Sequence, residues 1–537
     1  MSVEPPATFD AVPRTSNGRD SARAGRAGAT ASGPAQRLLE RFDGASARQA
    51  WLCIGALLCV VGVHLSTLTL SPPHWQDECQ IVDWGRATIF EPNTHWSVNM
   101  LDDGRNVPML PFVGPALQEL AYRALAPNPI GTRLATLFAA AGAVSCFFVW
   151  LKRRGGNSWE SLLASGLLFL DTVFTSSYRG ARVDAWALLA CFGSLALLRG
   201  GVIRKSLTSG RVMAVGAGLT LAPFIWPSAT MLAPIAIAEF YSVAFGTPHA
   251  RKSDNRTRLL RLLRFAAIGG AALALVVLGF LYWRNPNAFA LASTMVRSQF
   301  GNRPQTVLER ANACWITFRS SPVAWLAALF LVLRLPDRAT MAATGCVLVV
   351  LLSSLLYSHR VLYLMPYAAW IVAEALRNLR VRRNTSRPAW AVLVLLGCGA
   401  AMATLGLRTV LALEQRAGRD PAQLLPIAQH YIGAKKARVY LEEFAFYFAG
   451  RQLGWEIIRA YGNTNGYAPI FSDVDYAIVH TGGEYEAHLL KDGLRIIGKT
   501  EAPRLSGKSW LSHLSVGAQP YGSYTFLAGK RTFAPAQ

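Results

Sequence analysis

The 537-residue sequence is poor in charged residues, which make up only 16% of it. A soluble globular protein carries about 25% charged residues, so the shortage argues against a chain that is soluble throughout. Hydrophobic residues make up 52%. Many of them stand in apolar blocks of about 17–22 residues, roughly the length that crosses a bilayer core. The composition therefore predicts a protein that lies largely in lipid.

Acidic residues are scarcer still, with 31 Asp and Glu against 54 Lys and Arg and a formal net charge of +23. The basic residues gather in short segments between the apolar blocks, at 152–154, 199–211, 251–264 and 377–387. This is the positive-inside pattern of membrane proteins. The excess of positive charge therefore indicates the bilayer as a partner and no nucleic acid.

The chain also lacks a CxxC pair and any Cys/His spacing typical of a metal site. Of its eight cysteines, only Cys79 and Cys314 fall in segments expected outside the cytoplasm. The two cysteines could form a disulfide in an oxidising compartment, and two unpaired thiols are the simpler interpretation.

The apolar blocks predict a polytopic α-helical membrane protein with about eleven spans. The candidate spans are 51–70, 133–151, 158–176, 184–198, 212–226, 228–245, 265–283, 322–335, 340–357, 361–377 and 389–407. With the basic N-terminus inside, an odd number of crossings keeps every basic cluster in the cytoplasm. We therefore expect a multi-pass protein of the bacterial inner membrane, with a cytoplasmic N-terminus and a periplasmic C-terminus.

Three regions follow from the composition along the chain. Residues 1–48 read as a disordered basic cytoplasmic tail. Residues 49–408 form the transmembrane domain, with a long outer loop at 71–132. Residues 409–537 form a small extracytoplasmic α/β domain. Its expected strands are 438–441, 476–479 and 494–497, and its expected helices are 421–432 and 484–491.

The outer loop 71–132 holds two amphipathic stretches, at 79–90 and 114–125. Such stretches are expected to lie flat on the membrane surface.

An acidic pair, Asp77-Glu78, follows directly after the first apolar block, within the run His74-Trp75-Gln76-Asp77-Glu78. Carboxylates beside lipid are costly unless they are solvated or functional. Two solvated loop acids are the alternative interpretation.

A second polar group, Arg179-Gly180-Ala181-Arg182-Val183-Asp184, lies before the block that Asp184 opens. Asp184 could cap that helix with Arg179 and Arg182 as ion partners. By topology it shares a side with Asp77. Two carboxylates in one outer cavity could bind a divalent metal, or one could act as a general base.

A third group, Tyr357-Ser358-His359-Arg360 with Tyr363, stands in a short outer turn. An arginine there could hold a phosphate by paired hydrogen bonds, or could merely snorkel from the end of a span. Arg297, Arg303 and Arg310 are further candidates in the loop 284–321.

Taken in order, four motifs resemble the GT-C glycosyltransferases, and more narrowly the protein-mannosyltransferase, aminoarabinose-transferase and rhizobial glycosyltransferase-like group. The motifs are Asp77-Glu78 after the first span, Arg182-Val183-Asp184, the Pro-broken pair of spans from Gly218 to Pro234, and His359-Arg360 with Tyr363 and Pro366. The resemblance covers roughly residues 50–410.

The resemblance implies transfer of a sugar from a polyprenyl-phosphate-linked donor to a lipid, glycan or protein acceptor outside the cytoplasm. Asp77 would be the general base, with Glu78 beside it, and direct displacement would invert the anomeric carbon. Asp184, with Glu78, would hold a divalent metal if the enzyme uses one. The donor and its phosphate would be bound by Asp184, Arg182, His359, Arg360 and Tyr363.

Two other functions stay open on the sequence. A transporter or flippase of lipid-linked saccharides would also have many spans broken by proline. A non-catalytic membrane assembly partner would tolerate loss of both aspartates. A transferase requires Asp77, Asp184 and Arg360 to face one outer cavity.

Overall fold

The computed structural model describes residues 59–72, 76–100, 106–126, 128–204, 206–245, 252–291, 306–333, 336–353, 358–381, 387–433, 436–459, 474–502 and 521–529. The expected tail 1–48 lies outside the described residues, as do His74, Tyr357, Arg297 and Arg303 and the side chain of His359.

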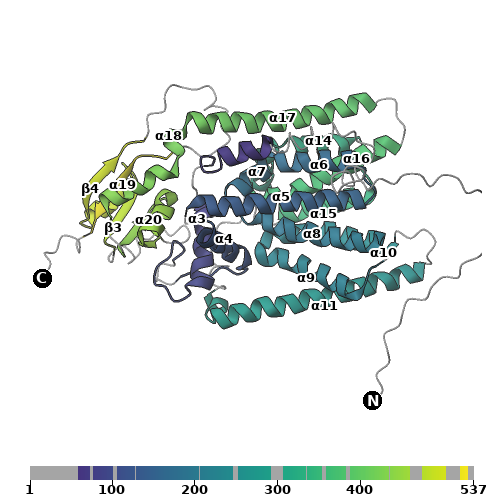
Figure 1. The fold of residues 1–537 in the computed structure, drawn as a ribbon, viewed down its shortest axis with the longest axis horizontal. Helices are drawn as coiled ribbons and strands as arrows, with labels where there is room; N and C mark the ends of the chain where they lie inside the picture. Colours follow the sequence, from purple (N-terminus) through teal and green to yellow (C-terminus); the bar gives the residue numbers. More distant parts are fainter. Residues whose placement is uncertain are drawn as a thin grey trace, which may run out of the picture. The chain divides into compact units, whose positions relative to one another are not determined.

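The first half of the described chain is a set of helices that run side by side (Figure 1). They are α5 (Pro129–Arg153), α6 (Ser158–Leu170), α7 (Thr172–Arg179), α8 (Asp184–Ile203), α9 (Ser209–Ile225), η2 (Pro227–Leu232), α10 (Ala233–Phe245) and α11 (Lys252–Arg284). α8 packs between α5 and α9, and α9 packs on α11. Buried side chains such as Phe147, Trp150 and Phe192 fill the space between α5 and α8.

The second half of the bundle includes a sharp corner. Its elements are α13 (Val307–Phe318), α14 (Pro322–Val332), α15 (Arg338–Ser353), η3 (Ser358–Leu364), α16 (Met365–Val381) and α17 (Arg387–Glu414). α13 and α14 meet at 111°. Ser321 caps α14 by accepting a hydrogen bond from the Ala324 amide (3.2 Å), and Pro322 opens the helix, so both residues favour a fresh start there.

The chain is an integral multi-pass membrane protein, but the expected eleven spans are not confirmed. A helix lies at each expected span within the described residues. Five of these helices are long and apolar enough to cross a membrane, or six if α13 and α14 count as one span. Fewer helices reach the length of a span than expected, and two breaks in the chain contribute to this. Asp171 ends α6 and caps α7, and Trp226-Pro227 separates α9 from η2.

The C-terminal region carries a five-stranded sheet in the order β2-β1-β3-β5-β4. The strands are β1 (Arg438–Leu441), β2 (Glu456–Ile458), β3 (Tyr476–His480), β4 (Arg495–Thr500) and β5 (Tyr524–Ala528). β1 pairs in parallel with β2 and β3, whereas β5 is antiparallel to β3 and β4. The helices beside it include α19 (Leu424–Tyr431), η5 (Phe444–Phe446), α20 (Tyr447–Leu453) and α21 (Glu484–Lys491). The three expected strands are present, together with β2 and β5, which were not expected.

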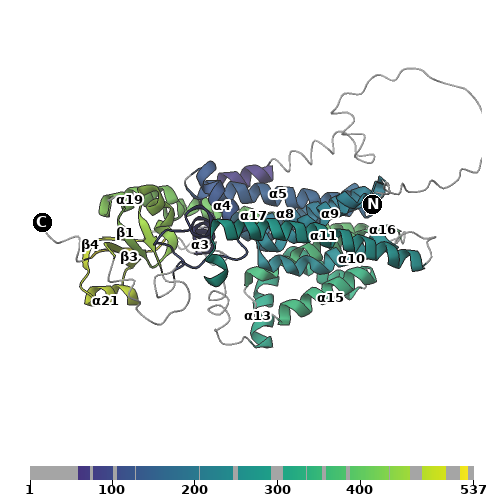
Figure 2. The ribbon, with the colours of Figure 1, turned by 90° about the horizontal axis from the view of Figure 1, so that it is seen from below.

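The segment 71–132, expected to be an outer loop, forms α3 (Gln76–Gly85), η1 (Arg86–Phe90) and α4 (Val113–Ala124), which confirms both amphipathic stretches as helices. Eight of the ten residues of α3 are buried, however, so this helix is not open on one side. Ile81 and Trp84 belong to the core of the bundle, whereas Cys79 and Val82 belong to the core of the sheet region. Both views place α3 next to the sheet (Figures 1 and 2).

Candidate functional site

Asp77 and Asp184 converge on one guanidinium group. Asp77 stands in the first turn of α3, and its carboxylate pairs with Nη1 of Arg182. Nε of Arg182 donates to Oδ2 of Asp184 at 2.9 Å. The Asp77 side chain keeps 26% of its surface exposed, while Asp184 is fully buried. Two carboxylates far apart in sequence therefore share one cation, with the first at the solvent side.

The chain between α7 and α8 is built to present Arg182. Ala181 adopts the left-handed conformation, with φ of 52°, which is uncommon outside glycine. Gln118 of α4 stabilises it by donating to the Ala181 carbonyl at 2.7 Å. Ser177 donates to Oδ2 of Asp184 at 3.0 Å. Asp184 lies in the first turn of α8, where a negative charge is favoured by the helix dipole.

Arg179 does not pair with Asp184, contrary to the sequence expectation. Its guanidinium donates instead to the carbonyl oxygens of Thr67 (2.6 Å) and Ser71 (2.9 Å), at the end of the first described helix. Arg179 therefore fixes the chain that leads toward Asp77, because it adds a donor to carbonyl oxygens at the end of that helix.

Glu78, predicted as a catalytic or metal-binding residue, is bound by a different partner from its neighbour. Its two oxygens accept from Nε (2.9 Å) and Nη2 (2.7 Å) of Arg133 on α5, and both side chains are fully buried. Arg133 also donates to the carbonyls of Leu68 and Pro72, each at 2.8 Å. In this arrangement Glu78 anchors α3 to α5, and its oxygens are already occupied.

The described residues do not form a ligand set for a divalent metal. Among them, no group of three or more His, Cys, Asp or Glu side chains is placed to hold an ion. Asp77 and Asp184 are joined by Arg182, and Glu78 is held by Arg133. We therefore derive no step through a metal, and the positive charge at this site comes from guanidinium groups.

Tyr363 reaches the same place from η3. Tyr363 is fully buried and interacts with both Asp184 and Arg182. Side chains three residues apart in a 3₁₀ helix stand over one another, so Arg360 lies on the same face of η3 as Tyr363. The Trp226 ring lies 5.7 Å from the Arg182 guanidinium carbon.

The electrostatic setting makes Asp77 a stronger base than an ordinary aspartate. Burial raises the pKa of its carboxyl group, Arg182 opposes this shift, and the nearby Asp184 carboxylate adds to it. A higher pKa brings the group closer to neutral pH, which is where proton transfer from a hydroxyl is most effective.

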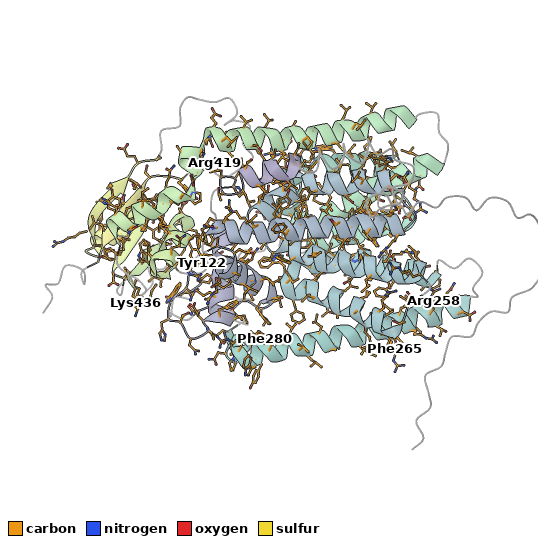
Figure 3. All side chains as sticks on the ribbon, in the orientation of Figure 1. Tyr122, Arg258, Phe265, Phe280, Arg419 and Lys436 are labelled. Atoms are coloured by element: carbon orange, nitrogen blue, oxygen red, sulfur yellow. The ribbon has the colours of Figure 1, made fainter. Side chains whose placement is uncertain are left out.

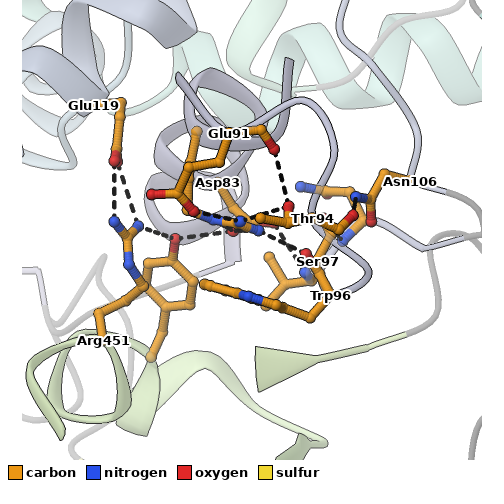
Figure 4. A network of polar contacts seen from close by, with 12 residues as sticks. Asp83, Glu91, Thr94, Trp96, Ser97, Asn106, Glu119 and Arg451 are labelled. Atoms are coloured by element: carbon orange, nitrogen blue, oxygen red, sulfur yellow. Dashed lines mark hydrogen bonds and ion pairs between the residues drawn. The ribbon is translucent and has the colours of Figure 1, made fainter. Parts of the chain in front are cut away.

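A second polar network, which the sequence did not indicate, ties the outer loop to the sheet region (Figure 4). Asp83 pairs with Arg86 at 2.8 Å and accepts from the Tyr447 hydroxyl of α20 at 3.2 Å. Glu119 of α4 pairs with Arg451 of α20 at 2.9 Å. Figure 3 labels Tyr122, whose ring lies 4.6 Å from the Arg451 guanidinium carbon. The helix that carries Asp77 is thus held from two sides.

Comparison with known proteins gives one clear finding, which concerns the fold. No family model and no curated protein matches the chain. The structure of ArnT from Cupriavidus metallidurans in the apo state matches with a TM-score of 0.59 and 12% identity, covering 90% of this chain and 100% of that one. The same protein bound to undecaprenyl phosphate matches with a TM-score of 0.60 and 11% identity, covering 91% and 100%.

A weaker match is the oligosaccharyltransferase of Archaeoglobus fulgidus, with a TM-score of 0.43, 12% identity and coverage of 79% of this chain and 69% of that one. This match carries no weight on its own. The ArnT matches extend over nearly the whole length of both chains. The resemblance to GT-C proteins drawn from four motifs is thereby confirmed at the level of the fold.

Proposed function

We propose that this protein is a membrane glycosyltransferase that takes a sugar from a polyprenyl-phosphate-linked donor and transfers it to a lipid, glycan or protein acceptor. The observation that carries the proposal is the convergence of Asp77, Arg182 and Asp184 at one end of the helical bundle. The fold shared with ArnT, which has been seen with undecaprenyl phosphate, supports a donor of this class.

In the proposed reaction Asp77 acts as general base. Its carboxylate accepts the proton of the acceptor hydroxyl as the hydroxyl oxygen forms a bond to the anomeric carbon. The bond from that carbon to the phosphate oxygen breaks, and the electron pair leaves with the polyprenyl phosphate. Direct displacement of this kind inverts the anomeric configuration.

The main demand of this reaction is to neutralise charge that develops on the leaving phosphate. Arg182 and Arg360 supply that charge in the proposal, since a guanidinium can donate paired hydrogen bonds to phosphate oxygens. Tyr363 and Asp184 position Arg182, and His359 is a further candidate for the phosphate. The expected outer location of this end of the bundle follows from the positive-inside pattern.

The test is a transfer assay on the purified protein with a panel of polyprenyl-phosphate sugars and acceptor lipids. We expect one donor to be turned over and Asp77→Asn to lose turnover by about 10²–10⁴-fold, the usual contribution of a general base. Glu484→Gln is a matched control, because Glu484 is 82% exposed on α21. Near-normal turnover by Asp77→Asn would remove Asp77 from the base role. Saccharide translocation in proteoliposomes without transfer would favour a flippase.

A further inference from the structure

A groove of about 570 Å³ lies between α14 and α17, and none of the site residues named above lines it. One wall is a single face of α17, formed by side chains that recur at helical spacing: Leu393, Leu396, Gly397, Ala400, Thr404, Leu407, Arg408 and Leu411. Eighteen residue steps along a helix correspond to roughly 27 Å. The groove is therefore long and mainly apolar.

The facing wall of the groove belongs to α14, which packs against small residues of α17. A Cβ atom at Gly397 would stand only 2.5 Å from a methyl carbon of Leu326 on α14, so the two helices are in close contact there. Trp325 adds its ring, and its Nε1 donates to the Arg319 carbonyl at 3.4 Å. On this face of α17 the side chains of Leu396 and Leu407 are 63% and 40% exposed, so the face is open to a lipid chain.

One end of the groove is positively charged. Arg319 stands at the corner where α13 turns into α14, and Arg408 stands on α17. Nη1 of Arg408 donates to the Thr172 carbonyl (3.4 Å) and to Ser176 Oγ (3.2 Å). The N-terminus of α14 adds the positive end of a helix dipole.

The nearest carboxylate is turned inward from this end. Asp171 is fully buried, accepts a hydrogen bond from Ser321 at 2.5 Å, and accepts another from the Val173 amide at 2.9 Å. Asp171 therefore caps α7 and offsets part of the charge of Arg408 from behind, while the exposed Arg319 faces outward.

We propose that this groove is a binding site for an anionic glycerophospholipid of the bilayer, with an acyl chain along α17 and the phosphate between Arg319 and Arg408. Charge complementarity selects the headgroup, because guanidinium groups form charge-assisted hydrogen bonds with phosphate oxygens. A tryptophan beside the two arginines is typical of the level at which headgroups lie. The site is separate from the proposed glycosyl transfer and does not depend on it.

A lipid at this place would act on the candidate site through α7. Arg408 contacts the first two turns of α7, at Thr172 and Ser176. The next residues of the same helix are Ser177, which binds Asp184, and Arg179, which binds the chain before Asp77. An occupied groove would thus restrain the helix that orders the site.

The experiment measures lipid binding directly, by native mass spectrometry and thermal unfolding of the purified full chain with added phosphatidylglycerol or phosphatidylcholine. We expect the wild type to prefer phosphatidylglycerol. In Arg319→Gln/Arg408→Gln that preference should fall by about 30-fold, at the usual contribution of two basic residues near a headgroup. Arg416→Gln is the matched control, because Arg416 is 69% exposed and does not line the groove.

A second variant tests the apolar part of the groove. Ala400→Trp leaves both arginines in place but fills the channel, and should weaken binding of both lipids. Unfolding without added lipid reports whether each variant is folded. An unchanged lipid preference in the double arginine variant overturns the proposal. So does displacement of phosphatidylglycerol by equimolar polyprenyl monophosphate, which would assign the groove to the carrier. Transfer activity enters neither readout, so failure here leaves the proposed reaction untouched.

Discussion

Two ion-pair clusters stand at opposite ends of α8 and have opposite charge balance. The Arg182 cluster, at the start of the helix, has one guanidinium between two carboxylates, Asp77 and Asp184. The Glu239 cluster, toward the end of the helix, has one carboxylate between two guanidinium groups, Arg154 and Arg199. The first carries a net negative charge and the second a net positive one.

The two clusters also differ in how exposed their carboxylates are. Glu239 is fully buried with both oxygens bound, and Arg199 donates a further hydrogen bond to Ser242 Oγ at 2.6 Å. In the Arg182 cluster the Asp77 side chain keeps 26% of its surface exposed. A carboxylate enclosed between helices holds them together, whereas a partly exposed one can also meet a ligand.

The largest effect on transfer is expected when the cation of the Arg182 cluster is removed. Arg182→Gln leaves two carboxylates facing each other without a counterion. In the proposed reaction it also removes the positive charge that stabilises the leaving phosphate. We expect transfer to fall by about 10²–10³-fold, the usual effect of losing one stabilising donor. Arg182→Lys should recover part of the rate. A kcat in Arg182→Gln within twofold of wild type would show that the cluster is structural.

The Glu239 cluster should respond in stability and not in catalysis. Glu239→Ala removes the carboxylate that Arg154 and Arg199 share, while Arg154 keeps Glu374 at 3.8 Å and Arg199 keeps Ser242. Breaking a buried ion pair typically costs about 3–5 kcal/mol. We expect a lower unfolding temperature with turnover per folded molecule unchanged. Thermal unfolding followed by intrinsic fluorescence, together with active-site-normalised rates, measures both. A loss of turnover in the folded fraction would contradict the distinction drawn here.

A smaller effect is expected at the edge of the Arg182 cluster. Arg360→Ala removes one candidate phosphate ligand from η3 while leaving Asp77 and Arg182 in place. We expect KM for the lipid donor to rise about tenfold, since one hydrogen bond to a charged group contributes roughly 1.5–3 kcal/mol. The acceptor KM serves as the internal control. An unchanged donor KM would assign Arg360 to a structural role.

The finest test is a pH profile. Asp77 must be ionised to act as base, so the rate should rise with pH through its pKa, which burial raises, Arg182 lowers and Asp184 raises. Removing the negative charge in Asp184→Asn should lower that pKa and move the acid limb of kcat/KM to lower pH. Removing the positive charge in Arg182→Gln should move it to higher pH. If the acid limb of kcat/KM were identical in the wild type and both variants, Asp77 would not be the group whose ionisation controls the rate.

The sequence predicted what local pattern and topology can specify. The side shared by Asp77 and Asp184 came from charge asymmetry, and the strand at 438–441 came from its apolar run. The partner of Glu78 could not be predicted, because Arg133 lies 55 residues away and no local pattern marks the pair. The error at Arg179 has the same origin: proximity in sequence favoured Asp184, but buried carbonyl oxygens at the end of the first helix accept from the guanidinium instead.

α3 contributes Ile81 and Trp84 to the core of the bundle and Cys79 and Val82 to the core of the sheet region. A movement of either core would therefore be transmitted to this helix. Asp77 is the second residue of this helix. A binding event that tilts the sheet would shift the Asp77 carboxylate through α3, a helix about 15 Å long. An acceptor that engages the C-terminal region could therefore set the reach of the base before its own hydroxyl arrives.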